Sequence, residues 1–142
     1  MKVYFSGSIM GGRELVATYR RIVDFLNEKG FTVLSEHVAS STITKEGEKK
    51  DPIYKYERDI KYLNICDIVV AETTMPSLGV GFEIAYAQQL GKKVICLFNS
   101  NSEHCLSAMV AGNNNIKLIK YKNLEEAEKV LYSVLKDFFP NK

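Results

Sequence analysis

Short runs of β-branched and aromatic residues alternate along the chain with longer segments whose apolar residues recur every three or four positions. The short runs predict strands and the longer segments predict helices. Strands are expected over residues 2–6, 31–36, 67–73, 93–98 and 116–121. Helices are expected over residues 12–30, 51–66, 102–112 and 124–139, with a further helix that ends at Gly91.

Several of these helices carry start or stop signals. Asp51 followed by Pro52 is a typical helix start, because an aspartate caps the first amides and proline fits the first helical position. Asn123 is expected to cap the last helix in the same way. Gly30 and Gly91 are expected to end the helices that precede them.

The order of these elements predicts the fold. The strand at 67–73 is almost continuously apolar, as expected for a strand covered on both faces. Alternating strands and helices with right-handed crossovers build a parallel sheet. The polar stretch that ends at residue 50 lacks a period and is expected to be a mobile loop. We therefore expect one α/β domain over residues 1–142, with a five-stranded parallel sheet and helices on both faces.

Composition limits the class of protein without naming a function. The chain has 142 residues, 46% of them apolar and 25% charged, which is ordinary for a soluble domain with its own core. A net charge of +2 without a basic run argues against a nucleic acid polymer as partner. The apolar runs are shorter than the roughly 18 residues of a membrane span. No signal or transit peptide precedes the first strand, so a cytoplasmic location is expected.

The cysteines and histidines do not suggest a disulfide framework or a metal site. Cys66, Cys96 and Cys105 are odd in number and form no C-x-x-C pair, so reduced, buried thiols are expected. His37 and His104 lack the spacing of metal ligands. We expect neither a structural nor a catalytic metal.

The loop after the first strand, SGSIMGGR, is the first candidate for ligand binding. Ligands of such sheets bind beyond the carboxyl ends of the strands. Glycines allow a close approach of the backbone, the following helix start favours an anion, and serine and arginine side chains could add donors. The candidate residues are Gly7, Ser8, Gly11, Gly12 and Arg13. The spacing matches neither a dinucleotide fingerprint nor a P-loop, so a phosphate site and a plain tight turn both remain open.

The loop after the third strand, TTMPSLGVGFE, is the second candidate. Ser77 and the amides near Gly79 could hold another anion. Glu83 stands in the first turn or two of the next helix, where it could simply complement the helix dipole. Residues 78–87 are otherwise uncharged, however, which indicates a buried helix. A buried carboxylate needs partners or a function.

Two further residues are ambiguous from their positions alone. Asp59 lies on a helix whose polar face also carries Glu57, Arg58 and Lys61, so a solvated role is the simplest interpretation. Tyr4 lies inside the first strand, where an ordinary core tyrosine is equally reasonable.

Four segments, taken in order, resemble the 2′-deoxynucleoside 5′-phosphate N-hydrolases, a branch of the nucleoside 2-deoxyribosyltransferase-like group. They are YFSGSIMGGR, SEHVA, RDIKYLNICDIVVAETTMPSLGVGFE and LSAM. Together they span nearly the whole chain, and PSLGVGFE is the most specific of them. The resemblance implies a flavodoxin-like (Rossmann-like) sheet, a homodimer, and no metal or organic cofactor.

The resemblance also implies roles for individual residues. Glu83 matches the carboxylate nucleophile of that family, Asp59 its second catalytic acid, and Tyr4 the tyrosine beside the sugar. A carboxylate is suited to this chemistry because cleavage of an N-glycosidic bond develops positive charge at C1′, which a carboxylate can stabilise or trap as an ester. The positive end of a helix would help to keep Glu83 ionised.

The same resemblance implies the substrate contacts. Ser8 and Ser77 match serines that hold the 5′-phosphate, and Ser107 matches a serine that reaches it from the neighbouring subunit. His37 falls near the base. Met10 stands where the family usually has an arginine, a change that bears on how tightly the 5′-phosphate or the base is held. The other expected contacts are Gly7, Ile9, Gly11, Gly12, Arg13 and Gly79.

The function implied is hydrolysis of a 2′-deoxynucleoside 5′-monophosphate, a small-molecule substrate, to free base and 2-deoxyribose 5-phosphate. A nucleoside 2-deoxyribosyltransferase and a ribonucleoside monophosphate N-hydrolase remain alternatives, because both use the same carboxylate. The serines and Arg13 favour a phosphorylated substrate. A non-catalytic nucleotide sensor would not need Glu83, Asp59 and Tyr4 together.

Overall fold

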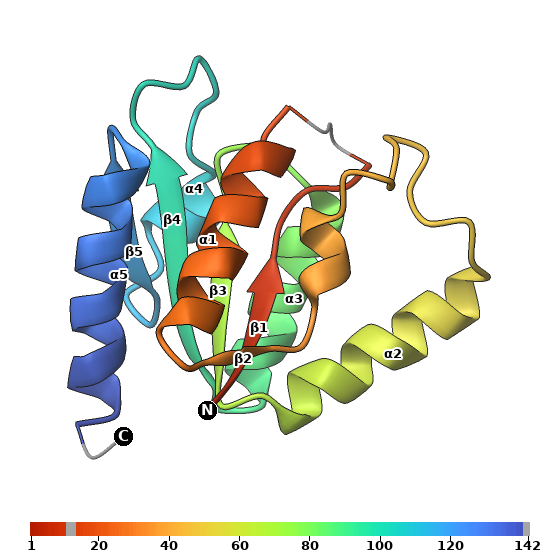
Figure 1. Ribbon diagram of the computed structural model, residues 1–142, viewed down its shortest axis with the longest axis horizontal. Coiled ribbons are helices and arrows are strands. Elements are labelled where there is room, and N and C mark those ends of the chain that lie inside the picture. The colour runs from red at the N-terminus through yellow and green to blue at the C-terminus, as the bar shows by residue number, and fades with distance from the viewer. Residues whose placement is uncertain (11–13, 141–142) are drawn as a thin grey trace.

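The computed structural model describes residues 1–10 and 14–140, so Gly11, Gly12 and Arg13 lie outside the described residues. Its sheet has five strands in the order β2-β1-β3-β4-β5, all paired in parallel (Figure 1). The strands are β1 (Lys2–Ser6), β2 (Thr32–Val33), β3 (Ile68–Glu72), β4 (Lys93–Asn99) and β5 (Lys117–Tyr121). The predicted five-stranded parallel sheet is confirmed.

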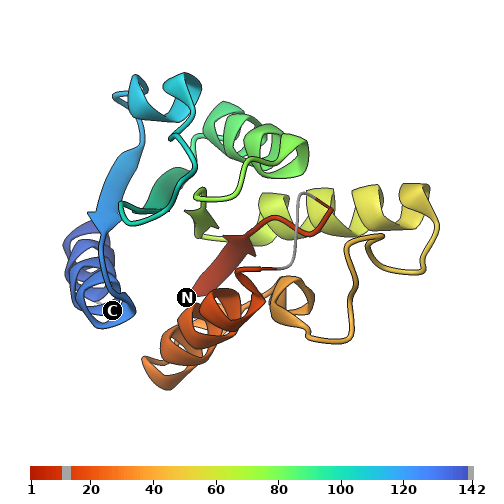
Figure 2. The same ribbon diagram turned by 90° about the horizontal axis from the view of Figure 1, so that it is seen from above.

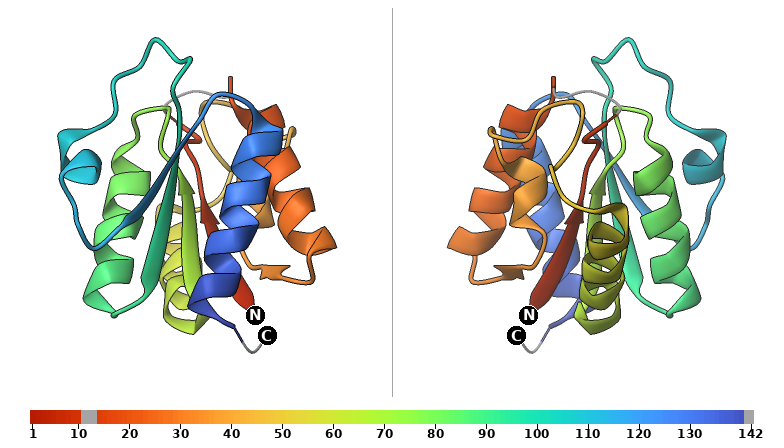
Figure 3. Two further views of the ribbon diagram at one scale, coloured as in Figure 1. Left: turned by 90° about the vertical axis from the view of Figure 1, so that its left-hand side faces the viewer. Right: turned by 90° about the vertical axis from the view of Figure 1, so that its right-hand side faces the viewer.

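Helices cover both faces of this sheet. They are α1 (Val16–Glu28), the 3₁₀ helix η1 (Glu36–Ala39), α2 (Pro52–Ile65), α3 (Leu78–Gln89), α4 (Ala108–Ala111) and α5 (Leu124–Phe138). In the view from above, α2, α3 and α4 lie on one face, and α1 and α5 on the other (Figure 2). The side views show the same two layers (Figure 3). None of the helices in the described residues is long and apolar enough to span a membrane.

The predicted start signals and stop signals of the helices are both confirmed. The Asp51 side chain accepts a hydrogen bond from the Ile53 amide at 2.7 Å, and Asn123 accepts one from the Glu126 amide at 2.9 Å. Gly30 has a φ of 83° and Gly91 a φ of 70°, a left-handed conformation that favours glycine and stops a helix.

Three predicted boundaries are wrong. The strand expected over 31–36 is only two residues long. Beyond it, the Ser35 hydroxyl replaces a strand backbone as the partner of Phe5 in β1, because it accepts from the Phe5 amide at 2.8 Å and donates to the Phe5 carbonyl at 2.6 Å. The helix expected from residue 102 starts at Ala108, because local turns such as the bond from the His104 amide to Ser102 Oγ at 3.1 Å compete with helix. The first helix starts at Val16.

The core is divided by the sheet into two apolar layers. One packs β1, β3 and β4 against α1 and α5, with Tyr19, Leu26 and Leu131 fully buried. The other packs the opposite face against α2 and α3, with Leu63 and Ile84 buried. All five residues of β3 are buried, which confirms that this strand is covered on both faces.

The cysteine prediction holds in part. All three cysteines are free, and Cys66 and Cys96 are buried as expected. Cys105 is exposed, because it lies in the irregular segment that precedes α4.

A buried acid at the end of β3, Glu72, connects the strands through hydrogen bonds. Glu72 is completely buried and accepts hydrogen bonds from the hydroxyl and the amide of Thr74, and from Tyr121 Oη at 3.2 Å. Burial raises the pKa of Glu72. Thr74 Oγ1 in turn accepts from the Asn99 amide at 2.8 Å, so this network ties the carboxyl ends of β3, β4 and β5 together.

The expectation that α3 is a buried helix is wrong for one of its faces. Val80, Ile84 and Ala87 are buried against the sheet. Leu78 is 97% exposed and Phe82 50% exposed, because the helix packs on the sheet through one side only. An apolar helix face is thus open in the single chain.

Candidate active site

The candidate site lies beyond the carboxyl ends of β1 and β3. These strands are neighbours at the point where the strand order reverses, which is where ligands bind in open α/β sheets. A hollow of about 190 Å³ opens there, between the two following loops, α2, α3 and the loop before α2. The residues lining it are Gly7, Ile9, Met10, Gly47, Glu48, Lys55, Arg58, Asp59, Ser77, Gly79, Val80 and Glu83.

Glu83 is held from β1 through both of its carboxylate oxygens. Tyr4 Oη donates to Oε1 at 2.9 Å, and Ser6 Oγ donates to Oε2. Tyr4 and Ser6 are two residues apart on a strand, so both side chains point to the same face. Burial raises the pKa of Glu83 to about 7, while the hydrogen bonds from Ser6 and Tyr4 act in the opposite direction.

This environment argues against a helix-dipole role for Glu83. The first turn of α3 contains no acidic residue, and Glu83 lies in the second turn. Burial, and then the nearby Glu83 carboxylate, raise the pKa of Tyr4 well above its ordinary value, so the phenol stays a donor. The sequence interpretation missed Ser6, although its place two residues after Tyr4 was a usable signal.

Asp59 lines the hollow, so the interpretation of Asp59 as a solvated residue is wrong. Glu57 and Lys61 are exposed, but Arg58 and Asp59 are partly buried. Arg58 Nε donates to Asp59 Oδ1 at 2.9 Å. His37 Nε2 lies 3.8 Å from the same oxygen, and His37 does not itself line the hollow. Burial, and then the Arg58 cation, lower the pKa of His37.

The serines predicted to bind phosphate occupy three different positions. Ser77 lines the hollow and caps α3, where its hydroxyl accepts from the Val80 amide at 3.3 Å. Ser8 is fully buried, and its amide donates to Tyr19 Oη at 3.1 Å. Ser107 is exposed, caps α4 and does not line the hollow of its own chain.

Two glycines shape the hollow differently. A Cβ at Gly7 would lie 3.0 Å from the Tyr19 ring, so this position has no room for a side chain. At Gly79 a Cβ would meet only Ser77 Oγ, at 3.8 Å, so glycine leaves open space where a ligand would lie. No group of three or more histidine, cysteine or acidic side chains within residues 1–10 and 14–140 could hold a metal ion.

A family model described as nucleoside 2-deoxyribosyltransferase matches residues 3–130. The chain belongs to this family. The resemblance drawn from the sequence motifs is thereby confirmed.

Similar members of the nucleoside 2-deoxyribosyltransferase family include two animal proteins. The 5-hydroxymethyl-dUMP N-hydrolase of Danio rerio is 39% identical, over 98% of this chain and 96% of the relative. The putative 2′-deoxynucleoside 5′-phosphate N-hydrolase 1 of Nematostella vectensis is 44% identical, over 97% of this chain and 93% of the relative.

Solved structures support the fold of the nucleoside 2-deoxyribosyltransferase family for this chain. The Clostridium botulinum CMP N-glycosidase BcmB superposes with a TM-score of 0.71 at 22% identity, covering 94% of this chain and 99% of BcmB. The solution structure of BlsM gives 0.73 at 18% identity, covering 90% of this chain and 85% of BlsM.

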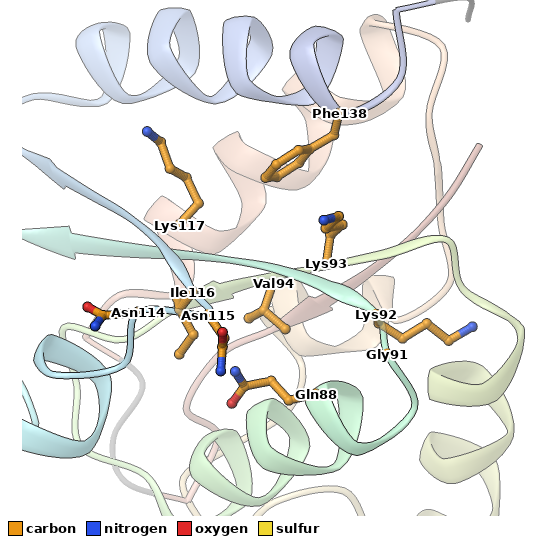
Figure 4. Close-up of a pocket in the computed structure, with 10 residues that line it drawn as sticks. All are labelled: Gln88, Gly91, Lys92, Lys93, Val94, Asn114, Asn115, Ile116, Lys117 and Phe138. Atoms are coloured by element: carbon orange, nitrogen blue, oxygen red, sulfur yellow. The ribbon is translucent and has the colours of Figure 1, made fainter.

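A larger hollow of about 520 Å³ lies at the opposite end of the sheet, by the first residues of β4 and β5 (Figure 4). Two of the lysines that line it have partners: Lys92 Nζ donates to the carbonyls of Asn64 and Cys66, and Lys93 Nζ lies 5.5 Å from the centroid of the Phe138 ring. The described residues that line it include no acid. The smaller hollow, which is lined by Glu48, Asp59 and Glu83, is therefore the candidate active site.

Proposed function

We propose that the protein hydrolyses the N-glycosidic bond of 2′-deoxynucleoside 5′-monophosphates, giving free base and 2-deoxyribose 5-phosphate. The observation that carries this proposal is Glu83, a partly buried carboxylate held through both oxygens by Tyr4 and Ser6 and sharing a hollow with Asp59. The N-hydrolase names of the full-length relatives support it.

In the proposed reaction, a Glu83 oxygen attacks C1′ as the bond to the base breaks, and the base leaves with a proton. Water then attacks C1′, loses a proton and releases Glu83 from its ester with the sugar. Asp59 lines the same hollow and is the group we propose to move these protons. Tyr4 and Ser6 hold the nucleophile in place, and no metal or organic cofactor is required.

We propose that the 5′-phosphate binds at the start of α3. Ser77 and Gly79 line the hollow there, and the first amides of a helix favour an anion. The Ser77 hydroxyl accepts from the Val80 amide, so its own proton is available to a phosphate oxygen. Ser8 and the glycines of the first loop are proposed to support the same group.

We propose further that the enzyme is a cytoplasmic homodimer in which Ser107 reaches the site of its partner. The open face of α3, with Leu78 and Phe82, supplies an apolar surface. α4 lies on the same face of the sheet as α3 (Figure 2), and Met109, two residues after Ser107, is 83% exposed. Mixing an inactive Glu83 variant with an inactive Ser107 variant should partly restore activity, because one hybrid site keeps both residues. A fully active monomer would contradict this arrangement.

A deoxyribosyltransferase is the second candidate, favoured by the description of the matching family. The test is to incubate the protein with each deoxynucleoside monophosphate, with the matching nucleosides and ribonucleotides, and with a second free base, and to quantify released base by chromatography. Release from monophosphates without exchange is expected. Base exchange would indicate a transferase, and equal turnover of a nucleoside and its monophosphate would contradict the phosphate site.

A further inference from the structure

Arg58, the residue before Asp59 on α2, binds three side chains from three segments. Its Nη1 and Nη2 donate to the two carboxylate oxygens of Glu48, both at 2.8 Å. Its Nε donates to Asp59 Oδ1 at 2.9 Å, and Nη2 lies 2.9 Å from His37 Nε2. Only 12% of the Arg58 side chain and 11% of the Glu48 side chain are exposed. A two-pronged, largely buried pair is stronger and more directional than a surface ion pair.

Glu48 belongs to a loop that has little regular structure of its own. The loop joins η1 to α2, and within it the bonds are local, such as those from Thr44 to Glu46 and from the Gly47 amide to the Thr44 carbonyl at 2.9 Å. Gly47 and Glu48 nevertheless line the hollow, together with Ser77 and Gly79 of the β3–α3 loop and α3. The Glu48–Arg58 pair fastens this loop to α2 at the edge of the hollow.

Arg58 of this pair also contacts Asp59, the proposed catalytic acid. Adjacent residues on a helix do not normally face each other. Arg58 nevertheless turns back onto Asp59, while its other edge is occupied by Glu48 and His37. The guanidinium is rigid and planar, so fixing one edge on Glu48 fixes the edge presented to Asp59.

We propose that Glu48 and Arg58 act together as a positioning pair that orients Asp59 and holds the loop before α2 as a wall of the hollow. This rests on the proposed function, in which Asp59 acts on the substrate. Neither member of the pair takes part in bond making, so both are positioning residues. Loss of either member should misplace Asp59 in the transition state and lower kcat, with a smaller effect on KM.

The opposite charges of the two residues allow positioning to be separated from simple electrostatics. Arg58→Gln removes a positive charge and Glu48→Gln a negative one, but both break the same pair. We expect each variant to lose roughly 10- to 100-fold in kcat. The double variant should be no slower than the slower single variant, because the two residues act as a unit. Arg58→Lys should have a low kcat like that of Arg58→Gln, because lysine keeps the positive charge but cannot bind both Glu48 oxygens and Asp59 at once.

His37 reports the charge change independently of activity. The groups that face it are Arg58 and Lys50, which lower its pKa, and Asp59 and Glu48, which raise it. By NMR titration the pKa of His37 should therefore rise in Arg58→Gln and fall in Glu48→Gln, while kcat falls in both. The only other histidine, His104, is exposed and serves as an internal control.

Glu46→Gln is the matched control, because Glu46 lies on the same loop, is exposed and binds Thr44. It should leave kcat unchanged, and circular dichroism should show that every variant is folded. Opposite changes of kcat in the two single variants, additive losses in the double variant, or a loss confined to KM would overturn the positioning pair. A parent enzyme that releases no base would instead overturn the proposed function, and the pair with it.

Discussion

Replacing Glu83 by glutamine tests the nucleophile through stability as well as through activity. Burial raises the pKa of Glu83 to about 7, from an ordinary value of 4.5. A difference of about 2.5 in pKa corresponds to about 3 kcal/mol by which the charged form of this carboxylate destabilises the folded state. Glutamine carries no charge and does not incur this cost.

The direction of the change in stability with pH follows from proton binding by Glu83. The folded state binds the Glu83 proton more tightly than the unfolded state, so this group stabilises the fold below pH 4.5, and that contribution is lost as the pH rises through about 7. At pH 8 Glu83→Gln should therefore be more stable than the parent by up to about 3 kcal/mol. The value is an upper bound, because Glu83 borders the open hollow. The amide can still accept from Tyr4 and donate to the Ser6 hydroxyl oxygen.

The assay combines urea unfolding at pH 5 and pH 8 with measured base release from a deoxynucleoside monophosphate. We expect a gain in stability that is larger at pH 8, and a fall in base release by orders of magnitude, because a neutral amide neither attacks C1′ nor stabilises positive charge. Glu126→Gln, in the first turn of α5, is the control for a true helix-dipole partner and should lose a little stability. A less stable Glu83→Gln protein at pH 8, or near-normal base release, would refute the reasoning.

Three further predictions concern the surroundings of this carboxylate. Ser6→Ala removes a hydrogen bond to the charged form of Glu83, so the acidic limb of the kcat/KM profile should move up by about one to two pH units; an unmoved limb would contradict this role. Ser77→Ala should reduce the preference for monophosphates over nucleosides roughly 10- to 100-fold, whereas an equal loss on both substrates would argue against phosphate binding. Glu72→Ala leaves the Thr74 and Tyr121 hydroxyls without their acceptor and should cost about 2–4 kcal/mol in urea unfolding; a change below 1 kcal/mol would contradict the structural role.

Much of the fold follows from the sequence, because the signals that specify it are local. The apolar run of β3 marked a strand buried on both faces, and the caps at Asp51 and Asn123 marked where two helices start. The motif PSLGVGFE indicated the family that the match over residues 3–130 confirms. Because ligands of parallel sheets bind beyond the carboxyl ends of the strands, the sequence also indicated the loop with Ser77 and Gly79, and Glu83 after it, as a candidate site.

Other features were decided only by the tertiary structure, because they depend on contacts between residues far apart in the chain. Ser6 and Glu83 are 77 positions apart, and only the pairing of β1 with β3 brings them together. The inward turn of Arg58 depends on Glu48 arriving from an irregular loop, which no periodicity specifies. Ser35 ended β2 early through side-chain bonds to β1 that helix and strand patterns do not encode. Sequence periodicity reports which face of an element is apolar, whereas the partners of each polar side chain are set by how the elements pack.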